Sequence, residues 1–125
     1  MVWSLLPLSR ESFEKAVLYA LERLRINPTD PQVLSQLAGY YADLGQKGDA
    51  MTALRKSLSL APGDRRVMSR AVTTFELLGD RKEAIDWLKK LAASGPISQE
   101  IKYSPEMKEL REDPRYRTLL SGDSQ

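Results

Sequence analysis

Apolar residues in the middle of the chain recur with the three-and-four spacing of an amphipathic helix. Between positions 31 and 44 they fall at i, i+3, i+4 and i+7 and so share one helical face: Leu34, Leu37, Ala38 and Tyr41. Asp30 is suited to cap this helix, Pro31 to begin it, and Gly45 to end it in a left-handed conformation. The pattern therefore predicts a helix over 31–44.

The same kind of pattern predicts a succession of helices along the chain. A second helix over 47–60 would bury Ala50, Leu54 and Leu58 and stop before Pro62. Further helices are expected over 65–78 and 81–93, and an earlier one over 12–25. After them, Ser104-Pro105 and Asp113-Pro114 each combine a capping side chain with a proline suited to a first helical turn. The chain is expected to be all-α.

Small residues recur along the chain at one fixed spacing. Alanine recurs at Ala16, Ala50 and Ala84, and proline recurs with the same spacing at Pro28, Pro62 and Pro96. Two independent markers that share a period of about 34 residues indicate an internal repeat, in which each period holds two helices. Alanines at the crossing of two antiparallel helices allow their backbones to approach closely.

This periodic pattern resembles the tetratricopeptide repeat family. The matching residues are Leu34, Leu37, Ala38, Tyr41, Gly45, Ala50, Leu54, Leu58 and Pro62, and then Met68, Ala71, Phe75, Gly79, Ala84, Leu88 and Pro96. The chain departs from the family pattern at Val72 and Ser57, where the family prefers a small residue and alanine. The resemblance implies antiparallel helix-turn-helix repeats that stack as a right-handed α-solenoid.

The repeat divides a single domain, residues 1–125, into four segments. A half repeat would occupy 9–30, complete repeats 31–64 and 65–98, and C-terminal capping helices 99–121. The tail resembles the closing segment, with a motif like "DPRF..LL", of multidomain bacterial signalling proteins. The matching residues are Asp113, Pro114, Arg115, Tyr116, Leu119 and Leu120. This likeness implies a C-terminal domain of a larger bacterial signalling protein.

The N-terminal segment leaves two alternatives open. Residues 1–8 are too short and too interrupted by Pro7 to form the first helix of the half repeat. They could pack as a lid over Phe13, Val17 and Leu21. Alternatively, the chain is a fragment with an exposed apolar surface around Trp3 and Leu6, which would favour a homodimer formed through the N-terminal end.

Composition removes several classes of function. The 125 residues include no cysteine and no histidine, which excludes thiolate and imidazole catalysis and Cys/His metal sites. No glycine-rich phosphate loop or hydrolase motif occurs, so we expect no catalytic residue, metal or cofactor. The segment "MVWSLLPLSR" lacks the features of a signal peptide, and no apolar stretch is long enough for a membrane span. A cytoplasmic chain without membrane contact is expected.

A protein or peptide ligand is the partner that these features favour. The net charge of +2 comes from charges that alternate along helical faces, and the two repeats carry no repeated base-reading code, so nucleic acid is not expected. In the family's architecture the first helices line a concave groove. The candidate groove residues are Gln32, Ser35, Gln36, Gly39, Asp43, Arg66, Ser69, Arg70, Thr73 and Glu76.

Arg66 and Arg70 give this candidate groove a basic pair. They are four residues apart, share one helical face and could hold an acidic ligand through charge-assisted hydrogen bonds. Chaperone-binding members of the family use a comparable pair in a carboxylate clamp, which is incomplete here because Gln36 stands where asparagine is expected. The sequence thus predicts a noncatalytic protein-interaction module with a scaffolding or regulatory role, and self-association through the N-terminal end is the alternative.

Overall fold

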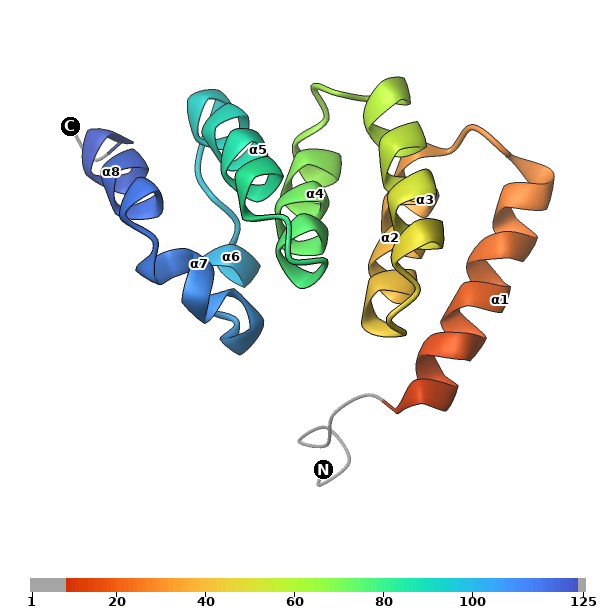
Figure 1. Cartoon of the computed structure of the whole chain (residues 1–125). Coiled ribbons are helices and arrows are strands. Elements are labelled where there is room, and N and C mark those ends of the chain that lie inside the picture. The colour runs from red at the N-terminus through yellow and green to blue at the C-terminus, as the bar shows by residue number, and fades with distance from the viewer. Residues whose placement is uncertain (1–8, 124–125) are drawn as a thin grey trace.

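The computed structural model describes residues 9–123, which form an arc of helices from α1 to α8 (Figure 1). The elements are α1 (Arg10–Ile26), α2 (Pro31–Asp43), α3 (Lys47–Leu60), α4 (Arg65–Leu77), α5 (Arg81–Ser94), α6 (Gln99–Tyr103), the 3-10 helix η2 (Pro105–Met107), α7 (Lys108–Glu112) and α8 (Pro114–Asp123). The described residues contain no strand, as the periodicity predicts. None of the helices within 9–123 combines the length and apolarity needed to cross a bilayer.

Side-chain caps and left-handed glycines set the helix boundaries. Asp30 accepts hydrogen bonds from the backbone N–H groups of Gln32 and Val33, at 3.0 and 3.2 Å, and Asp64 does the same for α4. Gly45 and Gly79 end the helices with φ of 77° and 81°, which confirms the predicted terminators. Helix α1 begins at Arg10, before the predicted start, because the Ser9 side chain caps it by accepting from the Ser12 N–H.

The alanines expected at the helix crossings are buried. Ala38, Ala50, Ala71 and Ala84 have no exposed surface, and Ala38, Ala71 and Ala84 belong to the core cluster shared by α1–α5. Helix α2 packs most extensively on α3, and α4 packs on α5 (Figure 1). Ser57, a departure from the family pattern, is also fully buried, and its hydroxyl donates a 2.7 Å hydrogen bond to the Pro31 carbonyl oxygen. This bond fastens α3 to the first turn of α2.

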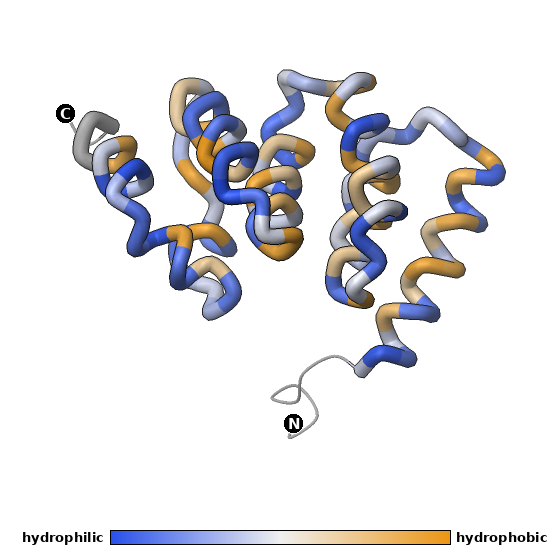
Figure 2. Tube along the Cα trace, in the orientation of Figure 1, coloured by the Kyte–Doolittle hydropathy of each residue, from blue (hydrophilic) through white to orange (hydrophobic). Residues whose placement is uncertain are grey.

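A second core cluster attaches the C-terminal segment to the repeats. It joins residues of α4 and α5, such as Val72 and Leu88, to Ile101, Met107 and Leu110 of the tail. The hydropathy colouring of Figure 2 shows apolar residues recurring through these helices. Met107, Leu110 and Tyr116 are buried, and Leu119 and Leu120 are partly buried against the same cluster. The tail therefore covers the end of the α4–α5 pair.

Helix α6 is not anticipated by the motifs of the tail. It begins at Gln99, one full repeat period after α4 begins at Arg65, and it is therefore a shortened first helix in the same register. Ser98 is its N-cap. Ser104 precedes Pro105 and has extended backbone angles, which ends α6 after one turn. The predicted helix start at Ser104-Pro105 is a 3-10 turn leading into α7.

Arg81 ties the tail to the last complete helix pair by ion pairs. Its guanidinium donates to both Glu76 carboxylate oxygens, at 2.7 and 2.6 Å, and to Asp113 Oδ2 at 3.2 Å. The Glu76 and Asp113 side chains are each 9% exposed. Hydrogen bonds from Arg115 and then from Arg81 lower the pKa of Asp113 below its usual range. This stabilisation is complete above the ordinary aspartate pKa and is lost as the pH falls below it.

Arg65 makes a second attachment at the end of α5. Its guanidinium donates to the carbonyl oxygens of Leu91 and Pro96 and to Ser94 Oγ. The backbone of Gly95 lies against this guanidinium. A Cβ at position 95 would lie 2.9 Å from an Arg65 nitrogen, and the φ of 148° at Gly95 disfavours other residues.

Residues Trp3 and Leu6, and hence the proposed lid, lie outside the described part of the chain.

We expect Gly95→Ala to destabilise the domain by about 1–3 kcal/mol, because alanine strains this backbone conformation and displaces Arg65. Urea denaturation measures the change. Gly48→Ala is the matched control, since its Cβ meets nothing within 4 Å, and helix propensity should make it neutral or stabilising by up to about 1 kcal/mol. Equal stability of the two variants would contradict the role assigned to Gly95.

Candidate binding site

The first helices α2, α4 and α6 line a hollow of about 510 Å³ together with α1 and η2. Its lining residues are Phe13, Ser35, Gln36, Gly39, Tyr40, Asp43, Arg70, Thr73, Thr74, Leu77, Glu100, Ser104, Glu106 and Met107. We call this hollow the groove. Its lining mixes aromatic and aliphatic side chains with charged groups, which is the usual character of a ligand site.

The groove is built from equivalent positions of the repeat. Gln36, Arg70 and Ser104 are each separated by one full period, and all three line it. The same holds for Gly39, Thr73 and Met107, which lie one turn further along. Three successive units thus present the same turns to one hollow, although the third unit contains only the short α6 and η2.

Hydrogen bonds between the first helices fix their spacing. Gln32 Nε2 of α2 donates to Oδ2 of Asp64, the cap of α4, at 2.9 Å. Ser69 of α4 donates to the hydroxyl of Ser98, the cap of α6, at 2.8 Å. Burial opposes ionisation of Asp64, but the donors from Val67, Gln32 and Arg66 outweigh it and lower the pKa of that carboxyl. These bonds hold the groove walls in place without a ligand.

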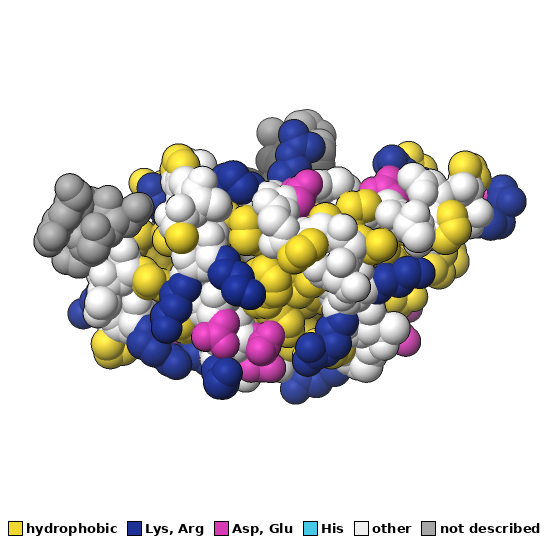
Figure 3. All heavy atoms as spheres, turned by 90° about the horizontal axis from the view of Figure 1, so that it is seen from above, with side chains coloured by type: hydrophobic (Ala, Val, Ile, Leu, Met, Phe, Trp, Pro, Cys, Tyr) yellow, Lys and Arg dark blue, Asp and Glu magenta, His cyan; other side chains and the backbone are white. Residues whose placement is uncertain are grey.

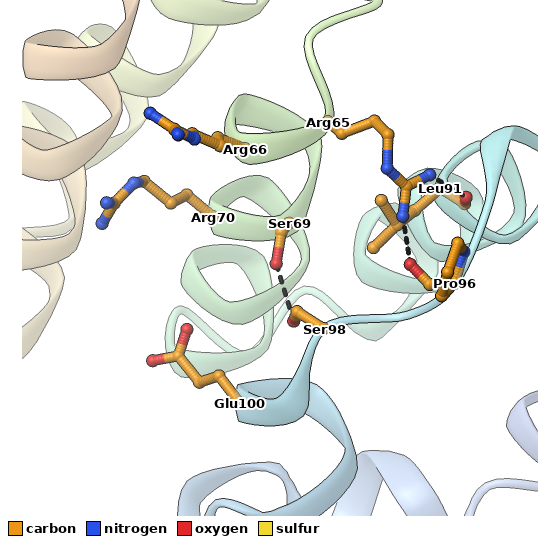
Figure 4. Close-up of a pocket in the computed structure, with 8 residues that line it drawn as sticks. All are labelled: Arg65, Arg66, Ser69, Arg70, Leu91, Pro96, Ser98 and Glu100. Atoms are coloured by element: carbon orange, nitrogen blue, oxygen red, sulfur yellow. Dashed lines mark hydrogen bonds between the residues drawn. The ribbon is translucent and has the colours of Figure 1, made fainter.

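Helix α4 contributes two arginines to the site. Figure 4 shows Arg66 and Arg70 extending from one side of α4, whereas Arg65 points the other way toward Leu91 and Pro96. Arg65 is fully engaged there, but Arg66 and Arg70 make no ion pair within 4 Å to a described residue. Arg70 Nε is buried and has no hydrogen-bond partner among the described atoms. We call Arg66 and Arg70 the basic pair.

Three carboxylates also line the groove. They belong to Asp43 of α2, Glu100 of α6 and Glu106 of η2, and Glu100 also lies beside Arg66 and Arg70 in a second, adjoining hollow. Partial burial raises the pKa of Asp43, and the charges of Glu106 and Glu100 raise it further. Among the described residues no lysine or arginine lies within 4 Å of these three carboxylates. We call Asp43, Glu100 and Glu106 the groove carboxylates.

The structure brings most of the candidate groove residues of the sequence together. Ser35, Gln36, Gly39, Asp43, Arg70 and Thr73 line the groove, and Arg66, Ser69 and Arg70 line an adjoining hollow of about 310 Å³. Ser35 and Thr73 are nearly buried, and their hydroxyls donate to carbonyl oxygens of their own helices. Gln32 and Glu76 line neither hollow, because Gln32 is bonded to Asp64 and Glu76 to Arg81.

Other groove residues are missing from the sequence-based set. Phe13, Tyr40, Leu77 and Met107 contribute the apolar part of the lining. Glu100 was within reach of the pattern, because it follows Gln32 and Arg66 at the same repeat spacing. Capping helices over 99–121, the expectation from the tail motifs, do not by themselves identify this position.

The arrangement suits noncovalent binding of a charged partner. Among the described residues no three Asp, Glu, His or Cys side chains are grouped closely enough to hold a metal ion. On the face shown in Figure 3, Lys and Arg side chains are scattered with acidic groups among them. That face therefore lacks the continuous basic stripe typical of nucleic-acid binding.

Asp43→Asn should raise the free energy of unfolding near pH 7. The raised pKa of Asp43 means that its ionised form costs the folded state free energy, and asparagine removes that charge. The gain should shrink as the pH falls from the raised pKa of Asp43 towards about 4, and it should vanish below that value, where the wild-type carboxyl is protonated in both states. Urea titrations of both proteins across this range measure the difference, with the exposed Glu109→Gln as control. A gain that does not depend on pH would contradict the prediction.

Comparisons with known proteins agree with this architecture. A family model described as a tetratricopeptide repeat matches residues 31–64, which hold α2 and α3. Over 84 residues the chain is 33% identical to cellulose synthase operon protein C of Pseudomonas fluorescens (strain SBW25). The matched stretch covers 67% of this chain and 6% of that relative, so the chain spans only a small part of the relative's length.

Proposed function

Because the chain belongs to the tetratricopeptide-repeat family, we propose that it binds a protein segment in the groove lined by α2, α4 and α6. Repeats of this family generally mediate protein–protein interaction and are not catalytic. The observation that carries the proposal is the groove itself, whose lining combines charged side chains that make no ion pair with described residues and apolar side chains. Such groups gain most from a ligand that brings complementary charges.

The rigidity of the groove supports binding of an extended or helical segment. Its walls are held by the Gln32–Asp64 and Ser69–Ser98 hydrogen bonds and by a close-packed core, so little conformational entropy is lost when a ligand is bound. An acidic side chain or a terminal carboxylate of the ligand would pair with Arg66 and Arg70. The basic pair therefore selects for an acidic group in the partner.

We further propose that this module is a scaffolding or regulatory part of a larger bacterial protein in the cytoplasm. Signalling is one regulatory role that such a part could have. The similar relative supports the first point, because the matched stretch is a small fraction of its length. Short repeat arrays commonly serve as binding sections within longer chains. The partner would then be another protein or another segment of the same protein.

Gly39→Leu should abolish binding in the groove while the fold is retained. A Cβ at Gly39 meets Thr74 Oγ1 at the ordinary contact distance of 3.8 Å, so a side chain can begin there without a clash, and because Gly39 lines the groove a leucine would fill part of it. Peptides that bind the full chain are selected from a displayed library of random peptides about twelve residues long. Fluorescence anisotropy then measures the affinity of the selected peptides. We expect affinity to fall at least about tenfold in Gly39→Leu.

Gly48→Leu is the control, because Gly48 also lies in a helix but has open space around it. It should bind the selected peptides as the wild type does. The charge-reversed variant Arg66→Glu/Arg70→Glu should lose the acidic peptides. If every selected peptide binds Gly39→Leu and the charge-reversed variant with unchanged affinity, the groove is not the binding site.

Self-association is a second candidate function, which the exposed face of α1 favours. Leu18, Tyr19 and Ile26 are 68%, 68% and 74% exposed, and Figure 2 shows apolar residues along α1. Tyr19 lies one full period before the buried Ala53, at a position that the first helix covers in a complete repeat. Within residues 9–123 nothing covers that face of α1, and the Arg23 guanidinium lies over the Tyr19 ring. A second copy could cover it.

For self-association through α1, sedimentation velocity should show a sedimentation coefficient that rises with protein concentration. Tyr19→Glu places a charge in the centre of the apolar face and should weaken the association at least about tenfold. Leu60→Glu, which alters an exposed leucine on α3, is the control and should associate as the wild type does. A chain that is monomeric at all concentrations would exclude this function.

A further inference from the structure

The third unit of the groove lacks the long second helix that supports the first two. Helices α2 and α4 each pack along a complete second helix, α3 and α5 (Figure 1). Helix α6 has five residues, and a helix of that length has little stability of its own in water. Its position therefore depends on contacts with neighbouring elements. Because Glu100, Ser104, Glu106 and Met107 line the groove, those contacts decide where one of its walls stands.

Two of these contacts lie at the start and in the middle of α6. Ser98, its N-cap, accepts a hydrogen bond from the Ser69 hydroxyl of α4. The Ile101 side chain is fully buried in the second core cluster. Both contacts lie before the end of α6, where the chain turns into η2, so that end needs an attachment of its own.

The end of α6 lacks a backbone donor because Pro105 follows it. In an α-helix the carbonyl oxygen of Ile101 would accept from the N–H of residue 105, and proline has none. At the equivalent positions of the complete repeats, Leu37 and Ala71 supply an N–H inside α2 and α4. Ile101 has no exposed surface, so water does not replace the missing donor. The third unit must satisfy this carbonyl group in another way.

Arg111 of α7 supplies the missing donor. Its Nη1 donates to the Ile101 carbonyl oxygen at 3.0 Å and to the Ser104 carbonyl oxygen at 2.8 Å. The guanidinium makes no ion pair within 4 Å to a described residue, so the carbonyl groups at the end of α6 are its principal partners. Hydrogen bonds from a charged donor are stronger than those from a neutral one.

We propose that Arg111 is a positioning residue of the binding groove, which holds the wall formed by α6 and η2 where a ligand contacts it. The inference rests on the proposed function, since it concerns the same groove. Arg111 lines neither hollow, so it acts on a ligand only through this wall. Without its two bonds the ligand must order the wall, which uses part of the binding free energy.

The central variant of the test is Arg111→Met, which keeps the aliphatic stem and removes the donors. The matched control is Arg117→Met, which removes the same charge from an exposed side chain of α8. Arg111→Met should weaken the binding of selected peptides that depend on Gly39 at least about fivefold, as expected for one lost hydrogen bond. Arg117→Met should leave their affinity unchanged. Arg111→Lys keeps a charged donor and should lose less than Arg111→Met.

Hydrogen exchange locates the effect within the full chain. The amides of residues 99–107 should exchange faster in Arg111→Met, whereas those of residues 31–60 should not, and a saturating peptide should restore the protection. In a Pro105→Ala background the backbone has an N–H that can donate to the Ile101 carbonyl oxygen. Arg111→Met should therefore cost less affinity in that background than in the wild type.

Four results would overturn the inference. Faster exchange of 99–107 with unchanged peptide affinity would make Arg111 purely structural. Equal losses of affinity in Arg111→Met and Arg117→Met would assign the effect to charge. Equally faster exchange of 31–60 would assign it to a general loss of stability. An equal cost of Arg111→Met with and without Pro105→Ala would show that the Ile101 carbonyl group is not what Arg111 satisfies.

These four results leave the proposed function intact, because the peptides would still depend on Gly39. If no selected peptide is sensitive to Gly39→Leu, the groove assignment itself fails, and the inference fails with it.

Discussion

The close approach of paired helices at buried alanines is the constraint on which the structure depends. Ala38 and Ala50 in one pair, and Ala71 and Ala84 in the next, have no exposed surface. Larger residues there would separate the helices or strain their side chains, since protein interiors are close-packed. Because the contact recurs once in every period, each pair repeats the geometry of the one before. The first helices then lie side by side and share one face.

This repetition separates the shape of the groove from its chemistry. Equivalent positions of successive units face the same hollow, yet the side chains at those positions differ. Gln36, Arg70 and Ser104 occupy one equivalent set, and they carry an amide, a guanidinium and a hydroxyl group in turn. The scaffold therefore fixes where ligand-facing groups stand, and the individual residues determine the chemistry at each position of the groove. A binding surface of this kind can change its partner without a change of fold.

Much of this structure could be predicted from local signals in the sequence. The repeat period, the capping aspartates and the left-handed glycines are local in the chain and set the helix starts at Pro31, Lys47, Arg65 and Arg81. Helix α6 escapes such prediction because one turn of helix carries almost no periodic signal of its own, and only the register with Arg65 identifies it.

The tertiary features were harder to predict. The engagement of Glu76 with Arg81, and of Arg65 with the end of α5, depends on contacts between separate elements that no local pattern encodes. The set of groove carboxylates likewise depends on where the tail folds back, since two of them follow α5. Phe13 contributes to the groove from α1 without any signal in its neighbours.

The Arg81–Asp113 ion pair has a consequence for how the groove and the tail are coupled. Glu100, Ser104, Glu106 and Met107 belong to the segment between α5 and this attachment, so the ion pair and the second core cluster together fix one wall of the groove. Loss of the ion pair would loosen that wall before the rest of the domain, because α2, α3 and α4 pack on one another without it. A ligand that bridges both walls would then bind more weakly, since part of its binding free energy would be needed to order the segment again.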